Sequence, residues 1–241
     1  MDDLPPTDES PDAGSGGGLG SFLNNTRNVI GAVTGLIVAV SGLLVALNKV
    51  GILGGDDDNG PKTETRPPAT IFGPIKRPIG RVYFDGETMY VRAAQPGRPL
   101  VHLADLEKPL RDVSMSARVS WVSGASDYGM SFVCRYDNSQ NYYLLAVLSG
   151  RRYNIARYRN GRVTSLTGGI QRSTKIAEES NDVTARCVSH DPTTLSLEVN
   201  GRPVATKQDR DGIESGNVGI RAGSSESFVV FRFEDFQLKY L

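Results

Sequence analysis

The sequence has few of the residues from which catalytic and metal centres are usually built. Its 241 residues include two histidines and two cysteines. His102 precedes a predicted loop and His190 falls in the turn SHDPTT, and neither has partners at zinc-ligand spacing. Serine-nucleophile motifs, phosphate-binding glycine loops and dinucleotide fingerprints are absent from the sequence. We therefore expect no metal and no cofactor, and a non-catalytic role over a catalytic one.

Net charge is also absent, because 27 Lys and Arg balance 27 Asp and Glu. Residues 1–28 combine Pro, Gly, Asp and Glu with almost nothing apolar, which is typical of a disordered acidic tail. Residues 54–79 are again rich in Gly, Asp, Pro and Thr. Because prolines exclude a helix, we expect a flexible tether there.

Charge is wholly missing from one long stretch, residues 29–47, VIGAVTGLIVAVSGLLVAL. At about 1.5 Å per residue this stretch makes a helix of roughly 28 Å, close to the thickness of the bilayer hydrocarbon. It is too long for the apolar part of a cleaved signal peptide and lacks the polar stripe of a soluble helix. The pattern predicts one transmembrane α-helix with its exit over residues 29–53, and the lipid bilayer as a partner.

Small residues follow one side of this predicted helix. They are Gly31, Gly35, Ala39, Gly42 and Ala46. Small side chains let membrane helices approach closely, which favours a homo-oligomer through this face. The alternative is that glycine and alanine are simply common in membrane helices.

From residue 80 onward the pattern changes to short runs in which apolar residues alternate with polar ones, as in strands with one buried face. Turn dipeptides separate several runs: Asp85-Gly86, Asn160-Gly161 and Asn200-Gly201 suit tight hairpins. The glycines of GNVGIRAG, residues 216–223, are interpreted as turns between strands. These features predict an all-β sandwich over residues 80–241. The predicted strands are 81–84, 88–93, 112–122, 129–136, 142–149, 153–159, 182–189, 194–200 and 228–241.

Several motifs of this region occur together. A strand ends in Cys134-Arg135, the next opens with Tyr142-Tyr143, a Leu-x-Leu-x-Val-Asn-Gly hairpin spans 195–201, and Phe-x-Asp-Phe at 233–236 lies in the last strand. The series resembles bacterial concanavalin A-like, laminin G-like jelly-roll domains, which are related to the 3-keto-disaccharide hydrolase-like fold. The resemblance implies a jelly-roll sandwich. It implies less about function, since such domains include sugar binders, protein binders and glycoside-cleaving enzymes.

The two cysteines bear on which side of the membrane the C-terminal domain lies. Cys134 and Cys187 lie on the apolar phase of predicted strands. Relatives of this type usually sit outside the cytoplasmic membrane, where a disulfide persists, so the resemblance implies a Cys134–Cys187 bridge and an extracytoplasmic domain. Two buried thiols are the alternative.

Basic residues around the apolar stretch favour the opposite orientation. One lies within about twenty residues before it and three within about twenty residues after it, which is typical of a cytoplasmic C-terminal region. They are Arg27, and then Lys49, Lys62 and Arg66. A cytoplasm-facing sensory or interaction component is therefore an open alternative.

Glycoside cleavage needs two carboxyl groups that face each other across the substrate. Glu198 is the only acid on its predicted strand, and the neighbours Glu234 and Asp235 point to opposite faces. No pair fits, so a glycoside-cleaving enzyme is the second hypothesis.

Binding residues are expected among aromatic rings and planar hydrogen-bond donors. The run GRRYNIARYRNGR places five arginines and two tyrosines in one predicted hairpin. Such a hairpin suits an anionic glycan or lipid headgroups, and nucleic acid only if the domain faces the cytoplasm; arginines paired with nearby acids are the alternative. The candidate ligand-binding residues are Arg135, Tyr142, Tyr143, Tyr153, Arg157, Tyr158 and Arg159.

Together these patterns predict a single-pass membrane protein of a bacterial cell surface. Its C-terminal sandwich is expected to be a non-catalytic recognition module for a glycan or a protein.

Overall fold

The computed structural model describes residues 63–64, 71–72, 76–77, 80–189 and 191–241. The named elements in these ranges are all β-strands, arranged in two antiparallel sheets, which confirms the all-β class for this part of the chain. The apolar stretch 29–47, with its face of small residues, lies outside the described residues. Among the residues that are described, no helix has the length and apolarity needed to cross a bilayer.

The larger sheet has nine strands, and its order is β14-β13-β12-β6-β16-β4-β3-β2, with β1 pairing with β16. The long strands β6, β12 and β16 lie at its centre. Its strands are β1 (Thr63–Glu64), β2 (Lys76–Arg77), β3 (Gly80–Asp85), β4 (Thr88–Ala93), β6 (Val113–Gly124), β12 (Ser180–Val188), β13 (Thr193–Val199), β14 (Arg202–Asp209) and β16 (Val229–Tyr240).

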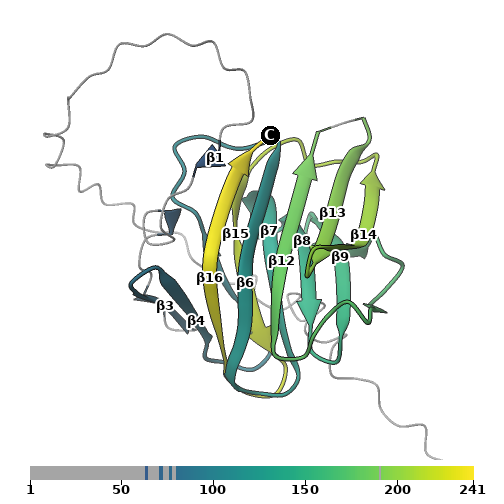
Figure 1. Ribbon diagram of the computed structural model, residues 1–241. Coiled ribbons are helices and arrows are strands. Elements are labelled where there is room, and N and C mark those ends of the chain that lie inside the picture. Colours follow the sequence, from purple (N-terminus) through teal and green to yellow (C-terminus); the bar gives the residue numbers. More distant parts are fainter. Residues whose placement is uncertain (1–62, 65–70, 73–75, 78–79, 190) are drawn as a thin grey trace, which may run out of the picture.

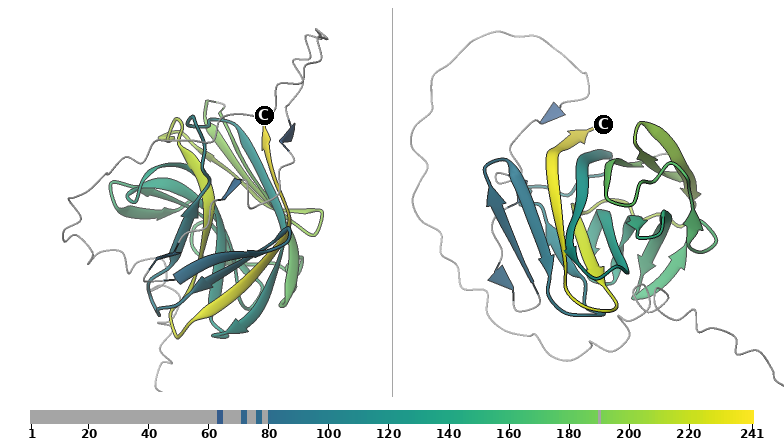
Figure 2. Two further views of the ribbon diagram at one scale, coloured as in Figure 1. Left: turned by 90° about the vertical axis from the view of Figure 1, so that its left-hand side faces the viewer. Right: turned by 60° about the horizontal axis from the view of Figure 1, so that its bottom comes forward.

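The smaller sheet has seven strands, in the order β10-β9-β8-β7-β15-β5, with β11 pairing with β9. Its strands are β5 (Leu100–Leu103), β7 (Tyr128–Asn138), β8 (Asn141–Leu148), β9 (Arg152–Arg159), β10 (Arg162–Ser165), β11 (Gln171–Arg172) and β15 (Asn217–Ser224). Figure 1 shows β6, β12 and β16 in front of β7, β8 and β15, so the sheets form two layers. The further views show the β3–β4 hairpin, in blue, flanking the yellow β16 at one side of the sandwich (Figure 2).

The main core fills the space between the layers. Alternate side chains of each strand point inward, as the period of two requires. Met115 and Phe233 from the larger sheet, and Phe132 and Leu145 from the smaller one, are each at most 1% exposed. This burial supplies the principal stabilisation of the fold.

Two predicted hairpin turns have the expected backbone. Asn160 and Gly161 have φ angles of 51° and 73°, and Asn200 and Gly201 have 54° and 70°. Positive φ at both central positions is the geometry that Asn-Gly supplies at low steric cost.

The interpretation of residues 216–223 as turns was wrong, because β15 occupies most of this run and pairs with both β5 and β7. Its glycines serve close approach between strands. A Cβ on Gly219 would lie 2.3 Å from the carbonyl oxygen of His102. Glycine therefore reflects crowding here and not a break in the strand.

Part of the predicted tether over 54–79 belongs to the fold. Thr63–Glu64 pair with the end of β16, and Lys76–Arg77 pair with β3. Phe72 is fully buried, and its ring meets that of Phe236 at 4.8 Å, edge to face. An aromatic ring packed in the core ties this segment to the sandwich.

A disulfide joins Cys134 on β7 to Cys187 on β12, with their Cα atoms 6.6 Å apart. It connects the two sheets directly. Because it closes a long loop, it restricts the unfolded chain.

Candidate binding surface

Strand β9 divides the five arginines of the predicted hairpin between two ends of the sandwich. Arg152 opens β9 and Arg159 closes it, about 23 Å apart at roughly 3.3 Å per residue. At the first end Arg151 lies 3.4 Å from Glu178, and Arg152 lies 3.6 Å from Asp127. The expected single patch of five arginines is therefore not formed.

The remaining three arginines line an open recess beside the β9–β10 turn. In the pairing of these strands Arg157 lies opposite Thr164 and Arg159 opposite Arg162, so the four side chains share one face. With Asn160 of the turn, they line the recess that we call the arginine cleft. The Asn-Gly turn thus sets the register that gathers these residues.

The guanidinium groups of the arginine cleft differ in their partners. Arg157 lies 2.6 Å from Asp209 and 3.6 Å from Asp211, and its side chain is 13% exposed. Arg159 donates a 2.5 Å hydrogen bond to the backbone carbonyl of Asp211, and Arg162 is exposed. Over the described residues, no carboxylate forms an ion pair with Arg159 or Arg162. These two cations are available to an anionic ligand.

Asp209 and Asp211 form an acid-x-acid pattern at the end of β14 that the sequence analysis missed. The run KQDRDG at 207–212 would have revealed it. Both carboxylates contact Arg157, although Asp209 is 6% exposed and the Asp211 side chain 74%. A glycoside-cleaving pair needs one protonated and one ionised carboxyl facing across a substrate, whereas here an arginine lies between them.

Tyr143 lies in the core and not at a ligand surface. Its side chain is fully buried, and its hydroxyl donates a 2.7 Å hydrogen bond to Asp209. Burial first, and the hydrogen bond to Asp209 second, raise the pKa of Tyr143 above its usual value. Its function is to anchor Asp209 beneath the arginine cleft.

Tyr142 and Tyr158 lie together on the other face of the smaller sheet. Their rings stack with centroids 4.4 Å apart and planes inclined by 10°. Arg221 of β15, which the sequence analysis did not select, donates a 2.9 Å hydrogen bond to the Tyr158 hydroxyl. This group combines aromatic faces with a planar donor, as expected, but its three side chains are at most 3% exposed. They offer no open surface in this structure.

Arg135 is buried and joins loops. It is 1% exposed, and burial lowers the pKa of its guanidinium. The group donates to the hydroxyls of Thr193 and Ser189 at 3.0 and 2.7 Å, and to the Ile213 carbonyl at 2.6 Å. With its hydrogen-bonding capacity used inside the protein, it is not positioned to bind a ligand.

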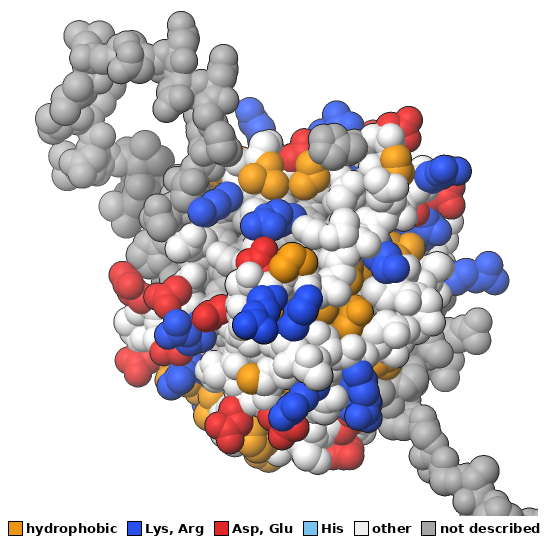
Figure 3. Space-filling model, turned by 45° about the vertical axis from the view of Figure 1, so that its right-hand side comes forward, with side chains coloured by type: hydrophobic (Ala, Val, Ile, Leu, Met, Phe, Trp, Pro, Cys, Tyr) orange, Lys and Arg blue, Asp and Glu red, His pale blue; other side chains and the backbone are white. Residues whose placement is uncertain are grey.

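Tyr153 packs against the main core and is only partly exposed. Arg157 and Arg159 are therefore the two predicted ligand residues that the structure brings to one recess. Figure 3 shows basic side chains spread over the side of the molecule that carries β14, with acidic ones among them. In the described part of the chain, no three His, Cys, Asp or Glu side chains are grouped as metal ligands.

No protein family matches the chain in a family search, and no curated protein matches it. Among solved structures, a carbohydrate-binding module, CBM66 from Bacillus subtilis, is 13% identical and has a TM-score of 0.53. The alignment covers 65% of this chain and 89% of the module. A glycosidic hydrolase is 9% identical, with 77% and 92% of the two chains covered and a TM-score of 0.48. The similarity to the module shows a shared β-sandwich fold.

Proposed function

We propose that this protein is a non-catalytic recognition module that binds an acid-bearing glycan and is held on the outer side of a membrane. The observation that carries the proposal is the arginine cleft. It presents Arg159 and Arg162 without carboxylate partners among the described residues. Guanidinium groups match the planar geometry of carboxylate and sulfate groups, which occur on uronic acids and sulfated sugars.

The polar residues around these cations suit a sugar as well. Asn160 and Thr164 line the same recess and supply an amide and a hydroxyl for hydrogen bonds to a sugar's hydroxyl groups. Asp209 and Tyr143 fix Arg157 from below, so the floor of the cleft is set before a ligand arrives. The fold shared with a carbohydrate-binding module is in keeping with this use.

The test is the affinity of the full chain, in detergent micelles, for a polyuronate oligosaccharide and for a neutral glucan of the same length. The double variant Arg159→Glu/Arg162→Glu should weaken polyuronate binding by about tenfold or more, because two attractive charges become repulsive. Arg202→Glu is the control, since Arg202 is exposed on β14 of the other sheet. Equal binding of both sugars, or unchanged polyuronate binding by the double variant, would show that the arginine cleft does not bind an acid-bearing glycan.

Membrane attachment rests on residues 29–47, whose uncharged length suits a bilayer span. The disulfide between Cys134 and Cys187 supports the outer side, because such bonds persist in oxidising compartments. A C-terminal reporter enzyme that is active on only one side of the membrane tests the orientation. Activity on the cytoplasmic side would favour the sensory or interaction role instead.

Glycoside cleavage is the second candidate, and the acid-x-acid pair Asp209 and Asp211 is the observation in its favour. The position of Arg157 between the two carboxylates weighs against it. Release of new reducing ends from the polyuronate, lost in Asp211→Asn, would establish this activity. Binding without such release agrees with a recognition module.

A further inference from the structure

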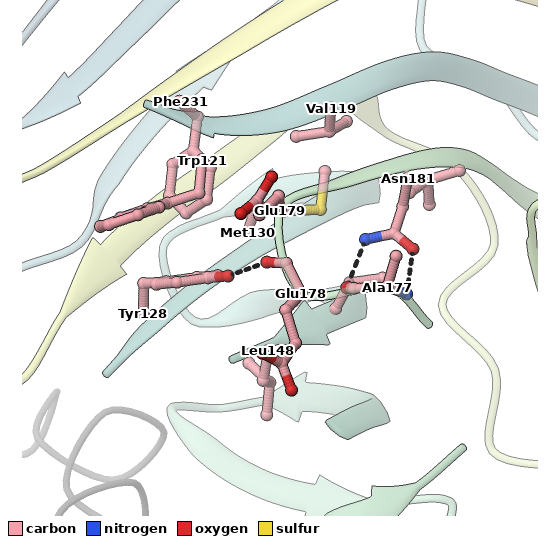
Figure 4. A pocket seen from close by; sticks show the side chains of 12 residues that line it. Val119, Trp121, Tyr128, Met130, Leu148, Ala177, Glu178, Glu179, Asn181 and Phe231 are labelled. Atoms are coloured by element: carbon pink, nitrogen blue, oxygen red, sulfur yellow. Dashed lines mark hydrogen bonds between the residues drawn. The ribbon is translucent and has the colours of Figure 1, made fainter. Parts of the chain in front are cut away.

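A second recess lies at the opposite end of the sandwich from the arginine cleft. It is formed where the end of β6, the start of β7 and the segment before β12 meet (Figure 4). Trp121 and Tyr128 stack there with ring centroids 5.7 Å apart and planes inclined by 11°. Tyr128 also meets Phe231 edge to face at 5.6 Å. Both stacked rings are partly exposed, so they form a rigid aromatic wall at the surface.

Residues 177–179 are held across this aromatic wall by hydrogen bonds. The backbone N–H of Trp121 donates to the Glu179 carbonyl at 2.9 Å, and the Tyr128 hydroxyl donates to the Glu178 carbonyl. The Asn181 side chain accepts a 2.8 Å hydrogen bond from the Ala177 N–H and donates a 2.9 Å hydrogen bond to the Ala177 carbonyl. The rim of the recess is therefore preorganised.

Two polar groups of the recess lack partners among the described residues. The Trp121 Nε1–H is a buried donor with no hydrogen-bond acceptor, and no basic group forms an ion pair with Glu179. In Figure 4 the Glu179 carboxylate lies beside the Trp121 ring, whereas the Glu178 side chain points toward Leu148. Glu178 instead pairs with Arg151 at 3.4 Å. An unused donor and an unused anion thus lie beside one aromatic wall.

The local field is negative. The pKa of Tyr128 is raised, first by burial and then by the negative charges of Glu178 and Glu179. Glu178 has Arg151 as a cation partner at 3.4 Å, whereas Glu179 forms no ion pair with a described residue.

We propose that the recess formed by Trp121, Tyr128 and Glu179 binds an amino sugar that carries a free amino group. The C–H face of a pyranose ring packs on the exposed aromatic surface. A water that accepts from the buried indole N–H can donate to a ring hydroxyl, and the hollow of about 20 Å³ has room for it. The ammonium group pairs with Glu179 and lies near the negative faces of the rings. A neutral sugar would leave the carboxylate uncompensated.

This site is independent of the arginine cleft, because it lies at the other end of the sandwich and selects the opposite charge. Trp121 is the single tryptophan of the chain, so tryptophan emission, excited selectively at wavelengths that the nine tyrosines do not absorb, reports on this recess. The probe is a chitosan oligosaccharide, added to the full chain in detergent micelles. We expect a saturable change in tryptophan emission, and binding at least about fivefold weaker for the fully N-acetylated oligosaccharide, which lacks the charge.

The matched variants are Glu179→Gln and Glu178→Gln. The first should weaken chitosan binding at least about fivefold, and the second should leave it within about twofold, since Glu178 points away and already has a cation partner. Both residues are exposed, so the fold is retained, as a thermal melt will verify. Arg159→Glu/Arg162→Glu should bind chitosan normally, which separates this test from that of the cleft.

Three results would overturn the proposal. One is the absence of any saturable emission change together with no retention of chitosan in equilibrium dialysis. Another is binding of the N-acetylated oligosaccharide with the same affinity as chitosan, which would show that the charge is irrelevant. Equal binding of a linear polyamine would likewise show that the sugar ring is irrelevant. The third is an equal loss of chitosan affinity in the Glu178→Gln and Glu179→Gln variants.

Discussion

The hydroxyl of Tyr143 donates a 2.7 Å hydrogen bond to Asp209, and this contact joins the two sheets. Tyr143 belongs to β8 of the smaller sheet, and Asp209 ends β14 of the larger one. The other oxygen of Asp209 accepts from Arg157 at 2.6 Å. A buried carboxylate with two strong donors is costly to disrupt, so the floor of the arginine cleft is part of the stability of the fold.

Asp209→Asn should therefore destabilise the protein by about 2–3 kcal/mol, because the substitution removes the closer charge partner of Arg157 and leaves that largely buried guanidinium only the exposed Asp211, whose carboxylate lies 3.6 Å away. Urea unfolding followed by Trp121 fluorescence measures the effect. Asp211→Asn is the control, since that side chain is 74% exposed and should cost less than about 0.5 kcal/mol. Equal effects of the two substitutions would contradict a structural role for the Tyr143–Asp209 contact.

Reduction of the disulfide should lower the free energy of unfolding by up to about 4 kcal/mol in the chain-entropy model. The sequence separation of Cys134 and Cys187 is 53 residues, which determines this value. Urea unfolding with and without reductant measures it, and Cys134→Ala/Cys187→Ala should match the reduced protein. Two thiols alkylated in the native, unreduced protein would be the contrary result.

Alkaline pH should destabilise the fold through Tyr142 and Tyr143. Burial raises the pKa of both, so above about pH 10 the unfolded chain loses protons that the folded chain retains. Stability is complete below the unfolded pKa and falls as the pH rises toward the folded pKa, by about 1.4 kcal/mol per pH unit for each tyrosine.

The measurement is the free energy of unfolding between pH 9 and pH 12 for the protein and for Tyr142→Phe/Tyr143→Phe. The double variant should show the shallower decline. Tyr83→Phe, at a side chain that is 39% exposed, is the matched control. An unchanged slope in the double variant would show that the two phenols do not govern alkaline unfolding.

Gly219→Ala should destabilise the smaller sheet by about 2 kcal/mol or more, because the added methyl would meet backbone atoms of β5 that cannot move aside. The nearest are the His102 carbonyl oxygen at 2.3 Å and the Leu103 Cα at 3.0 Å. Gly86→Ala is the comparison: no atom lies within 4 Å, so only its positive φ of 58° carries a cost, of about 1 kcal/mol. A thermal melt that ranks the two substitutions in the opposite order would contradict this account.

The candidate site was only partly predictable from the sequence. Alternation placed Arg157 and Arg159 on one face of a strand, and the Asn160-Gly161 turn folded Arg162 back beside them. The same alternation does not say which faces are covered. Tyr142 and Tyr158 therefore looked available to a ligand, although the structure buries both.

Residues distant in the sequence explain the other differences. Arg135 is held by partners 54 to 78 residues away, and the acid that fixes Arg157 comes from the other sheet. Arg221 joins the stacked tyrosines from β15, a strand that had been interpreted as turns because it contains several glycines. No local pattern encodes such contacts.

The sequence alone determined the all-β class, the Asn-Gly hairpins and the apolar phase of both cysteines, because each depends on neighbours within a few residues. Only the tertiary structure decided which side chains meet. It paired Cys134 with Cys187 and brought the Tyr143 hydroxyl into hydrogen-bonding contact with Asp209. It also placed the arginines of β9 at opposite ends of the sandwich. The physical reason is that two stacked sheets bring together residues whose separation along the chain is set by topology and not by local periodicity.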